Sequence, residues 1–214
     1  MLKADLHIHT EYSMDCQTPL DMIIDRCVEL GINCIAVSDH GTAEGALKMQ
    51  TMAPFTVIVA EEILTHDGEI MGMFLKETIP SHLSPEETID RIRAQGGLVC
   101  IPHPFDPFRG SAFGSHIDGI IDHIDVIEVY NSRSPLKRSS QKARQFAEKH
   151  GFARSAGSDA HTVHEIGNAY VQMPEFSDKE GFLRALNQGT IHGRKSSLFR
   201  HFNSTWAKIK NHTG

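Results

Sequence analysis

Short apolar runs alternate with amphipathic segments along most of the chain. The runs are rich in β-branched residues, and in the segments between them apolar residues return every three or four positions. This alternation is typical of repeated βα units around a mostly parallel sheet or barrel. The predicted strands are residues 3–8, 33–38, 55–61, 70–75, 98–101, 125–130, 153–156, 170–173 and 190–193.

Capping residues mark the helix boundaries. Thr18 before Pro19 predicts the start of a helix that ends at Gly31, because hydroxyl side chains cap helix N-termini and glycine ends helices. Ser84, followed three residues later by Glu87, predicts a capping box at the start of the next helix. The predicted helices cover residues 18–30, 84–95, 134–149 and 177–188.

The whole chain is predicted to form one domain. Its 214 residues are within the range of a single large α/β domain, and no repeat, low-complexity tract or shift of composition marks a second one. We expect residues 197–214 to form a tail or a short final helix. Residues 104–123 are the longest predicted irregular stretch, and loops of that length are often functional.

Composition excludes several classes of function. The formal net charge of −6 and a pI near 6.1 argue against a broad cationic surface for nucleic acid or anionic membranes. No segment approaches the roughly 20 apolar residues of a membrane span, so we expect a cytoplasmic protein without a membrane partner. The four cysteines have no CxxC spacing and are expected to be buried thiols.

Histidine is the one unusual component, with 14 histidines against 3 tyrosines and 1 tryptophan. His7 and His9 flank one residue at the end of the first predicted strand, so both rings point to the same side of an extended chain. Histidines and carboxylates also follow later strands, and strand ends converge at one rim of a parallel barrel. Imidazole and carboxylate without thiolate suit a catalytic site for zinc, manganese or iron.

Taken in order, these motifs resemble those of the PHP family, the polymerase and histidinol phosphatase superfamily. The motifs are His7-Ile8-His9-Thr10, Ser13 with Asp15, Ser38-Asp39-His40, Glu62, His103-Pro104 and Gly157-Ser158-Asp159-Ala160-His161. The resemblance covers residues 5–161. It implies an α/β fold, a single distorted (βα)7 barrel, with two or three divalent metal ions at the carboxyl ends of the strands.

The resemblance also implies a set of ligands for each ion. The first ion would be held by His7, His9, Glu62 and Asp159, the second by Glu62 and His103, and the third by Asp15, His40 and His161. The family usually adds a histidine to the second site, and here Glu69 would replace it, with His66 and His82 as weaker candidates. Asp15 stands where the family has His or Asp, which should weaken the third site for zinc and leaves a two-metal enzyme open.

Three acidic residues beside the motifs have supporting or unrelated roles in this interpretation. Asp5 is expected to point to the ligand side of its strand, and Asp39 to support His40 or cap a turn. Glu61 should point away from Glu62 and be solvated or paired with a cation.

Substrate recognition is assigned to residues just after two strands. Arg109 and Arg133 would bind phosphate oxygens, because the guanidinium fork matches them in a bidentate way. A structural ion pair with a nearby acid is an equal alternative for both arginines. Asn131 would orient the substrate or cap a turn.

The expected activity is hydrolysis of a phosphate ester by a metal-bridging hydroxide, with Glu62, His40 and His161 as catalytic residues. The substrate would be a small phosphorylated molecule, which includes a nucleotide or a short oligonucleotide end. Two alternatives remain open. An amidohydrolase-like enzyme could attack a carbon–nitrogen bond with the same metals, and a non-catalytic accessory module could keep the fold without the chemistry.

Overall fold

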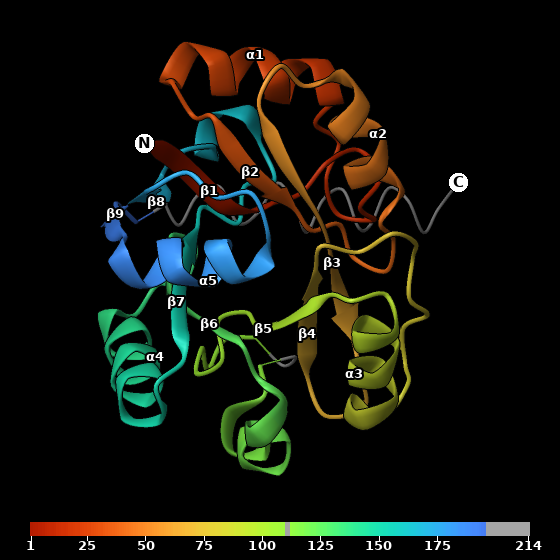
Figure 1. Cartoon of the computed structure of the whole chain (residues 1–214), viewed down its shortest axis with the longest axis vertical. Coiled ribbons are helices and arrows are strands. Elements are labelled where there is room, and N and C mark those ends of the chain that lie inside the picture. The colour runs from red at the N-terminus through yellow and green to blue at the C-terminus, as the bar shows by residue number, and fades with distance from the viewer. Residues whose placement is uncertain (110–111, 196–214) are drawn as a thin grey trace.

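The computed structural model of the chain describes residues 1–109 and 112–195, and Figure 1 shows their arrangement. The predicted C-terminal tail or helix lies outside these residues. The strands are β1 (Leu2–Ile8), β2 (Cys34–Val37), β3 (Thr56–Leu64), β4 (Glu69–Met73), β5 (Leu98–Ile101), β6 (Val126–Asn131), β7 (Ala153–Gly157), β8 (Ala169–Met173) and β9 (Thr190–Gly193). The helices are α1 (Leu20–Leu30), α2 (Glu44–Met52), α3 (Pro85–Ala94), α4 (Lys137–His150) and α5 (Lys179–Gln188), with 3-10 helices η1 (Gly114–His123) and η2 (Val163–Glu165).

The strands form one sheet that curls into a nearly closed barrel. Its order is β7-β6-β5-β4-β3-β2-β1-β8-β9, in which β8 is antiparallel to β1 and β9 is antiparallel to β8. The carboxyl ends of β7 and β1 meet, because Asp159 N donates to His7 O at 2.8 Å and His9 N donates to Ala160 O at 3.0 Å. The predicted distorted α/β barrel is therefore confirmed.

Gly157 permits this closure. A Cβ on Gly157 would lie 2.2 Å from the Cβ of His7 and 2.7 Å from its backbone nitrogen. Only glycine lets the two strands approach so closely.

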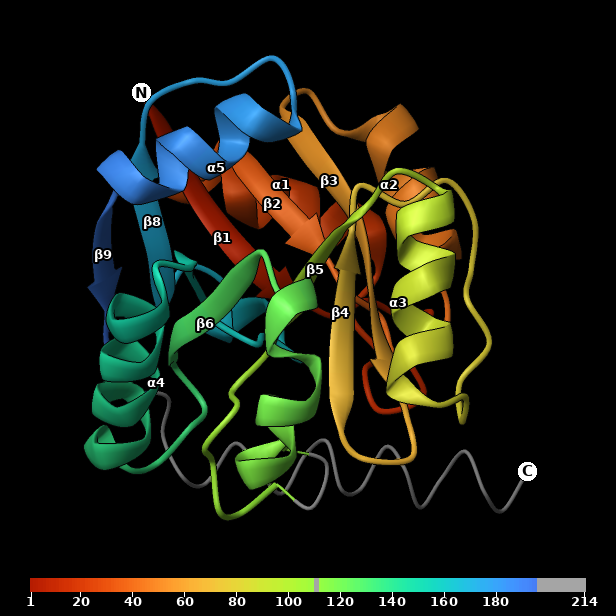
Figure 2. The same ribbon diagram turned by 60° about the horizontal axis from the view of Figure 1, so that its bottom comes forward.

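The β3–β4 hairpin interrupts the βα repeat. Strand β4 runs antiparallel to both β3 and β5. Strands β1, β2 and β3 run parallel to one another, and so do β5, β6 and β7. The opposite direction of the β4 arrow is visible in Figure 2. The start of β4 therefore lies at the same end of the barrel as the ends of the parallel strands.

Helix starts agree with the sequence at one position and differ at another. Ser84 caps α3 as predicted, with its Oγ accepting from Glu87 N at 3.1 Å. The predicted Thr18 cap is wrong, because the Thr18 hydroxyl donates instead to His161 O at 3.1 Å and Pro19 takes the cap position. This bond ties the start of α1 to the loop after β7.

Three helical segments were not predicted: α2, η1 and the three-residue η2. Helix α2 buries only Gly45, Ala46 and Met49, so its short apolar stripe gives a weak periodic signal. Residues 114–123 were expected to be irregular, but they form η1, whose Ile117 and Ile120 enter the hydrophobic core.

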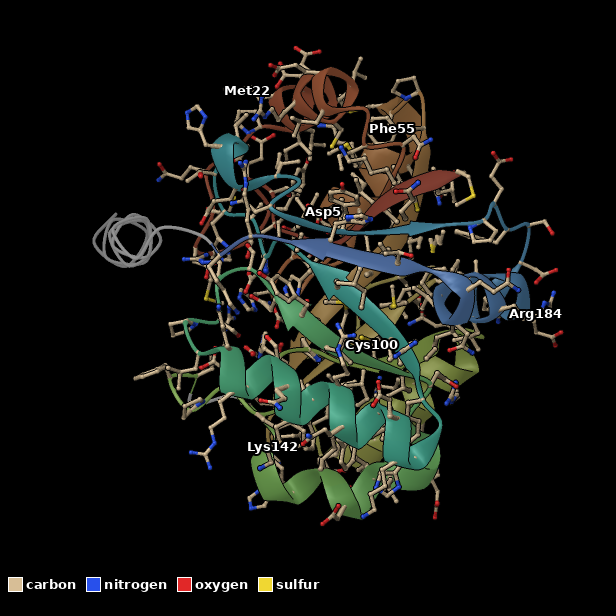
Figure 3. The ribbon with its side chains drawn as sticks, turned by 90° about the vertical axis from the view of Figure 1, so that its left-hand side faces the viewer. Asp5, Met22, Phe55, Cys100, Lys142 and Arg184 are labelled. Carbon is tan, nitrogen blue, oxygen red and sulfur yellow. The ribbon has the colours of Figure 1, made fainter. Side chains whose placement is uncertain are left out.

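The core has two parts, one on each face of the curled sheet. Helices α1 to α4 pack against the outer face, whereas α5 crosses the end of the barrel where β1 and β2 begin (Figure 2). In Figure 3, Cys100 lies within the ribbon, while Lys142 and Arg184 point outward from α4 and α5. All four cysteines are buried and unpaired, as expected. In the described part of the chain, no helix has the length and apolarity to cross a bilayer.

Candidate metal centre

A β-bulge in β1 directs His7 and His9 into the barrel. Asp5 pairs with Ile35 and Ile8 pairs with Val37, so β1 spans three residue steps where β2 spans two. Ile35 and Val37 both point outward, and Asp5 and Ile8 therefore point outward as well. The expectation that Asp5 shares the ligand face is therefore wrong. Asp5 instead accepts from Ser158 N at 2.8 Å and from Gly167 N at 2.9 Å, which fixes the loop after β7. Bulges of this kind re-aim side chains next to active sites.

The first candidate group consists of His7, His9 and Asp159, all fully buried or nearly so. The Nε2 atoms of His7 and His9 lie 3.1 Å apart, and Asp159 Oδ1 is 3.4 Å from His9 Nε2. Asp159 has a φ of +54°, a backbone conformation that non-glycine residues rarely adopt. Glu62 completes the set, because its Oε2 is 3.2 Å from His7 Nε2.

The second carboxylate oxygen of Glu62 faces a second candidate group. Glu62 Oε1 lies 2.8 Å from His103 Nε2, and these two residues form a cluster with His7. Glu69, at the start of β4, is 3.6 Å from the same His103 nitrogen through its Oε2. The hairpin therefore brings the Glu69 carboxylate beside His103.

The third group contains Asp15, His40 and His161, together with His9. Asp15 Oδ2 lies 3.1 Å from His161 Nε2 and 3.6 Å from His40 Nε2. The His40 side chain is 15% exposed, whereas the side chains of His7, His9 and Glu62 are completely buried. The third group is thus the one nearest to solvent.

Burial and mutual charge set the protonation of these groups. Burial opposes ionisation of Glu62, but the neighbouring His7 and His40 outweigh it and hold the pKa of Glu62 well below its usual range. Burial would lower the pKa of His9, yet Asp159 and Glu62 raise it to about 9. Burial, with the charges of His9 and Arg133, lowers the pKa of His161 to about 3, so its ring is neutral near pH 7.

Asp39 and Glu61 lie outside the metal groups found in the described residues. Asp39 accepts from the backbone and hydroxyl of Thr10 at 2.6 and 2.7 Å, so it fixes the chain directly after His9. Glu61 was expected to be solvated or paired with a cation, and this expectation is wrong. Its side chain is fully buried and accepts a hydrogen bond from Ile79 N at 2.9 Å. Burial raises the pKa of Glu61 to about 7. His66 and His82 also lie outside the groups and are exposed.

The three predicted substrate residues lie in or beside the centre. Arg109 pairs with Asp159, and its Nη1 is 3.2 Å from His103 Nε2. Asn131 donates to Asp159 Oδ2 at 3.1 Å. Arg133 is 5% exposed, with its Nε 3.9 Å from Glu165 Oε1, and Glu165 in turn accepts from His161 N at 3.2 Å. Each arginine therefore has an acidic neighbour, which is the structural alternative raised from the sequence.

Sequence reasoning missed Glu128, on the inner face of β6. Glu128 contacts His7 and the backbone of His103. A signal was present, because an acid in the apolar run Val126-Ile127-Glu128-Val129 is unusual unless it has buried partners.

The donor set fits divalent metal ions. Imidazole nitrogens and carboxylate oxygens converge without thiolates, which suits zinc, manganese or iron. Asp159 Oδ1 is buried and finds no hydrogen-bond partner among the described residues. Two ring nitrogens only 3.1 Å apart beside two carboxylates are also the arrangement expected of atoms that share a cation.

Several known proteins are similar to this chain. The uncharacterized protein MJ0417 of Methanocaldococcus jannaschii is 36% identical over 180 residues, which cover 82% of this chain and 72% of that protein. A candidate metal-dependent phosphoesterase of Bifidobacterium adolescentis has the same fold, with a TM-score of 0.65 at 16% identity over 92% of this chain and 98% of that one.

Two more solved structures share the fold. An amidohydrolase of Chromobacterium violaceum with bound sulfate has a TM-score of 0.63 at 17% identity, over 77% of this chain and 89% of that one. The lesion-specific endonuclease PfuEndoQ of Pyrococcus furiosus has a TM-score of 0.67 at 17% identity, over 89% of this chain. This chain spans 57% of the endonuclease.

Two family models match the sequence itself. The PHP domain model matches residues 5–62, which carry five of the candidate ligands His7, His9, Asp15, His40 and Glu62. The PHP-associated model matches residues 137–191, which include Asp159 and His161. Together with the 36% identical relative, these matches show that the chain belongs to the PHP family.

Proposed function

We propose that this chain is a metal-dependent phosphoesterase that hydrolyses the phosphate ester of a small molecule, a nucleotide or an oligonucleotide end. The observation that carries the proposal is the meeting of nine candidate ligands in one buried cluster, with Arg109 at its edge. The ligands are His7, His9, Asp15, His40, Glu62, Glu69, His103, Asp159 and His161. Ions held by these residues would lower the pKa of water and neutralise charge on the phosphate.

The protein residues have separate tasks in this proposal. Glu62 holds its negative charge between the first two groups, because it lies within 3.4 Å of His7, His9 and His103. His40 and His161 belong to the group nearest solvent, so the leaving oxygen would depart on their side.

Phosphate binding would fall to the cationic and amide side chains at the rim. Arg109 and Arg133 would exchange part of their contacts with acids for phosphate oxygens, and Asn131 would orient the substrate. A nucleotide or oligonucleotide substrate is further supported by the fold shared with the lesion-specific endonuclease.

The test is metal analysis coupled to a phosphate-release screen. Protein purified without chelator should contain two or three equivalents of zinc, manganese or iron, and should release phosphate from nucleotide, sugar or amino-alcohol esters. Glu62→Gln, purified in the same way, controls for contaminating phosphatases, and His66→Ala controls for the loss of an exposed histidine outside the groups.

Two results would contradict the proposal. Full activity in metal-free, chelator-treated protein would exclude metal-dependent hydrolysis. Hydrolysis of amides without phosphate release, and without inhibition by inorganic phosphate, would instead favour the amidohydrolase-like alternative, which the same ligand set could support.

A further inference from the structure

Glu128 connects two candidate metal groups although it belongs to neither of them in the described residues. Glu128 is only 3% exposed, and both of its carboxylate oxygens contact neighbouring residues. Oε1 lies 3.1 Å from His7 Nδ1, and Oε2 accepts from His103 N at 2.9 Å. Oε2 also accepts from Asn131 Nδ2 at 3.0 Å, so one side chain joins β1, β6 and the loop after β5.

The contact with His7 determines which ring nitrogen can bind an ion. His7 Nδ1 faces Glu128, whereas His7 Nε2 faces the other candidate ligands. A ring that binds a cation through Nε2 keeps its one proton on Nδ1, where it is donated to Glu128. His7 Nε2 is 3.1 Å from His9 Nε2 and 3.2 Å from Glu62 Oε2, at the centre of the cluster.

The contact with His103 supports an unusual backbone conformation. His103 has a φ of +29°, which few non-glycine residues adopt. Its N–H donates to Glu128, while its Nε2 lies 2.8 Å from Glu62 Oε1. The same carboxylate thus holds the turn that directs the His103 ring toward Glu62.

Irregular pairing in both strands fits this role. The register of β1 with β2 shifts between Asp5 and Ile8, on either side of His7. The register of β6 with β7 shifts between Glu128 and Tyr130. Bulges re-aim side chains near active sites, and here one lies beside each member of the His7–Glu128 pair.

We propose that Glu128 is a positioning residue that fixes the tautomer of His7 and the backbone of His103, and so prepares both groups for metal ions. The inference rests on the proposed function, because it requires that these histidines bind metal. It adds a residue that joins the group His7–His9–Asp159 to the group His7–Glu62–His103.

Glu128→Gln tests the proposal with almost no change of shape. If the amide oxygen stays with His103 N–H and Asn131, the NH2 faces His7 Nδ1 and favours the tautomer whose Nε2 carries the proton. If the amide is turned round, its NH2 faces the donors of His103 and Asn131. We expect the affinity for zinc to fall roughly 10- to 100-fold, as when outer partners of metal-bound histidines are lost.

Two spectroscopic measurements separate this role from a general structural one. Nitrogen-15 spectra of the zinc-loaded protein should show His7 coordinated through Nε2 in the wild type and a changed ring signal in Glu128→Gln. The His103 amide proton of the metal-free protein should move upfield in the variant, because it loses a charged acceptor. Competition with a chromophoric chelator gives the zinc affinity.

Glu61→Gln is the matched control, because Glu61 is a buried strand carboxylate that also accepts from a backbone N–H, that of Ile79. Its zinc affinity should stay within about twofold of the wild type. If Glu128→Gln does not fold, Glu128→Asp keeps the charge but withdraws it from both partners, and should also weaken zinc binding.

The outcomes distinguish this inference from the proposed function. A wild-type protein that binds no divalent metal contradicts the proposed function. A wild type that binds zinc, with position-128 variants that bind it equally well and an unshifted His103 amide, overturns the role of Glu128 alone.

Discussion

At the end of the barrel where the parallel strands begin, apolar side chains fill the interior, whereas imidazoles and carboxylates fill it where those strands finish. Phe182 of α5 and Met73 of β4 are fully buried at the first end, and His7 and Glu62 are as deeply buried at the second. Burial stabilises the apolar end by about 1.5–3 kcal/mol for each large side chain. At the other end burial opposes charge, which ion pairs and metal ions must offset. The fold therefore separates stability from chemistry along one axis.

The largest expected effect on activity is that of Glu62→Gln. The amide preserves the shape but removes the charge between the first two groups, so both ions should be lost together. We expect activity to fall by more than the roughly 10- to 100-fold typical of outer partners. Metal content and steady-state kinetics measure this loss. Unchanged metal content with full activity would show that the polar end does not depend on this charge.

Phe182→Ala should have the opposite profile. Removing this fully buried ring should lower the free energy of unfolding by about 3–5 kcal/mol, because a cavity remains under α5. Metal affinity of the folded protein should not change. Urea denaturation measures the loss, and Phe108→Ala, at a 70% exposed phenylalanine, is the control and should change stability by less than about 0.5 kcal/mol. A fall in metal affinity with Phe182→Ala would mean that the two ends are coupled.

Asp15→Ala should cause a partial loss, because it removes a ligand only from the most exposed group. If that group stabilises the leaving oxygen, an alkyl phosphate should lose on the order of 10- to 100-fold in kcat, and a nitrophenyl phosphate much less. The comparison of the two esters is the measurement. Equal losses on both would refute the leaving-group role.

The smallest effect concerns two buried thiols, Cys34 inside the barrel and Cys27 on α1 in the core outside the sheet. Burial raises the pKa of Cys34 to about 12, and that of Cys27 also to about 12, so both remain protonated at pH 8. Iodoacetamide should label neither thiol in the native protein, whereas both should react in urea, where thiol pKa values return to about 8.5. Because the folded pKa lies above the unfolded one, the folded state loses stability as pH rises above about 8.5. Native labelling at the unfolded rate would show that the apolar core around these thiols opens readily.

The fold was largely predictable because the chain repeats one simple pattern. Alternating strands and helices, together with Ser84 as a cap, indicate α/β units from local chemistry alone. The reversal of β4 was not predictable, because a short apolar run has no direction. Helix α2 was missed because its buried residues are mostly small.

The candidate centre was predictable where residue type and position agree. His7, His9 and His103 stand at strand ends, and the structure brings them together with Glu62. The predicted orientation of Asp5 was wrong, because the prediction assumed that side chains alternate regularly along β1. A one-residue bulge in β1 puts Asp5 and His7 on opposite faces of the sheet. Glu128 was missed for a related reason, since its role depends on contacts with two distant segments.

The hairpin between β3 and β4 makes strand register part of the composition of the site. Glu62 faces Met71 and Leu64 faces Glu69, so both glutamates share one face of the hairpin. A shift of β4 by one residue against β3 would move Glu69 to the opposite face, whereas a shift by two residues would place a different side chain of the same parity beside Leu64. A relative could therefore exchange its ligand at this position by a two-residue register shift in the hairpin, with every other strand left in place.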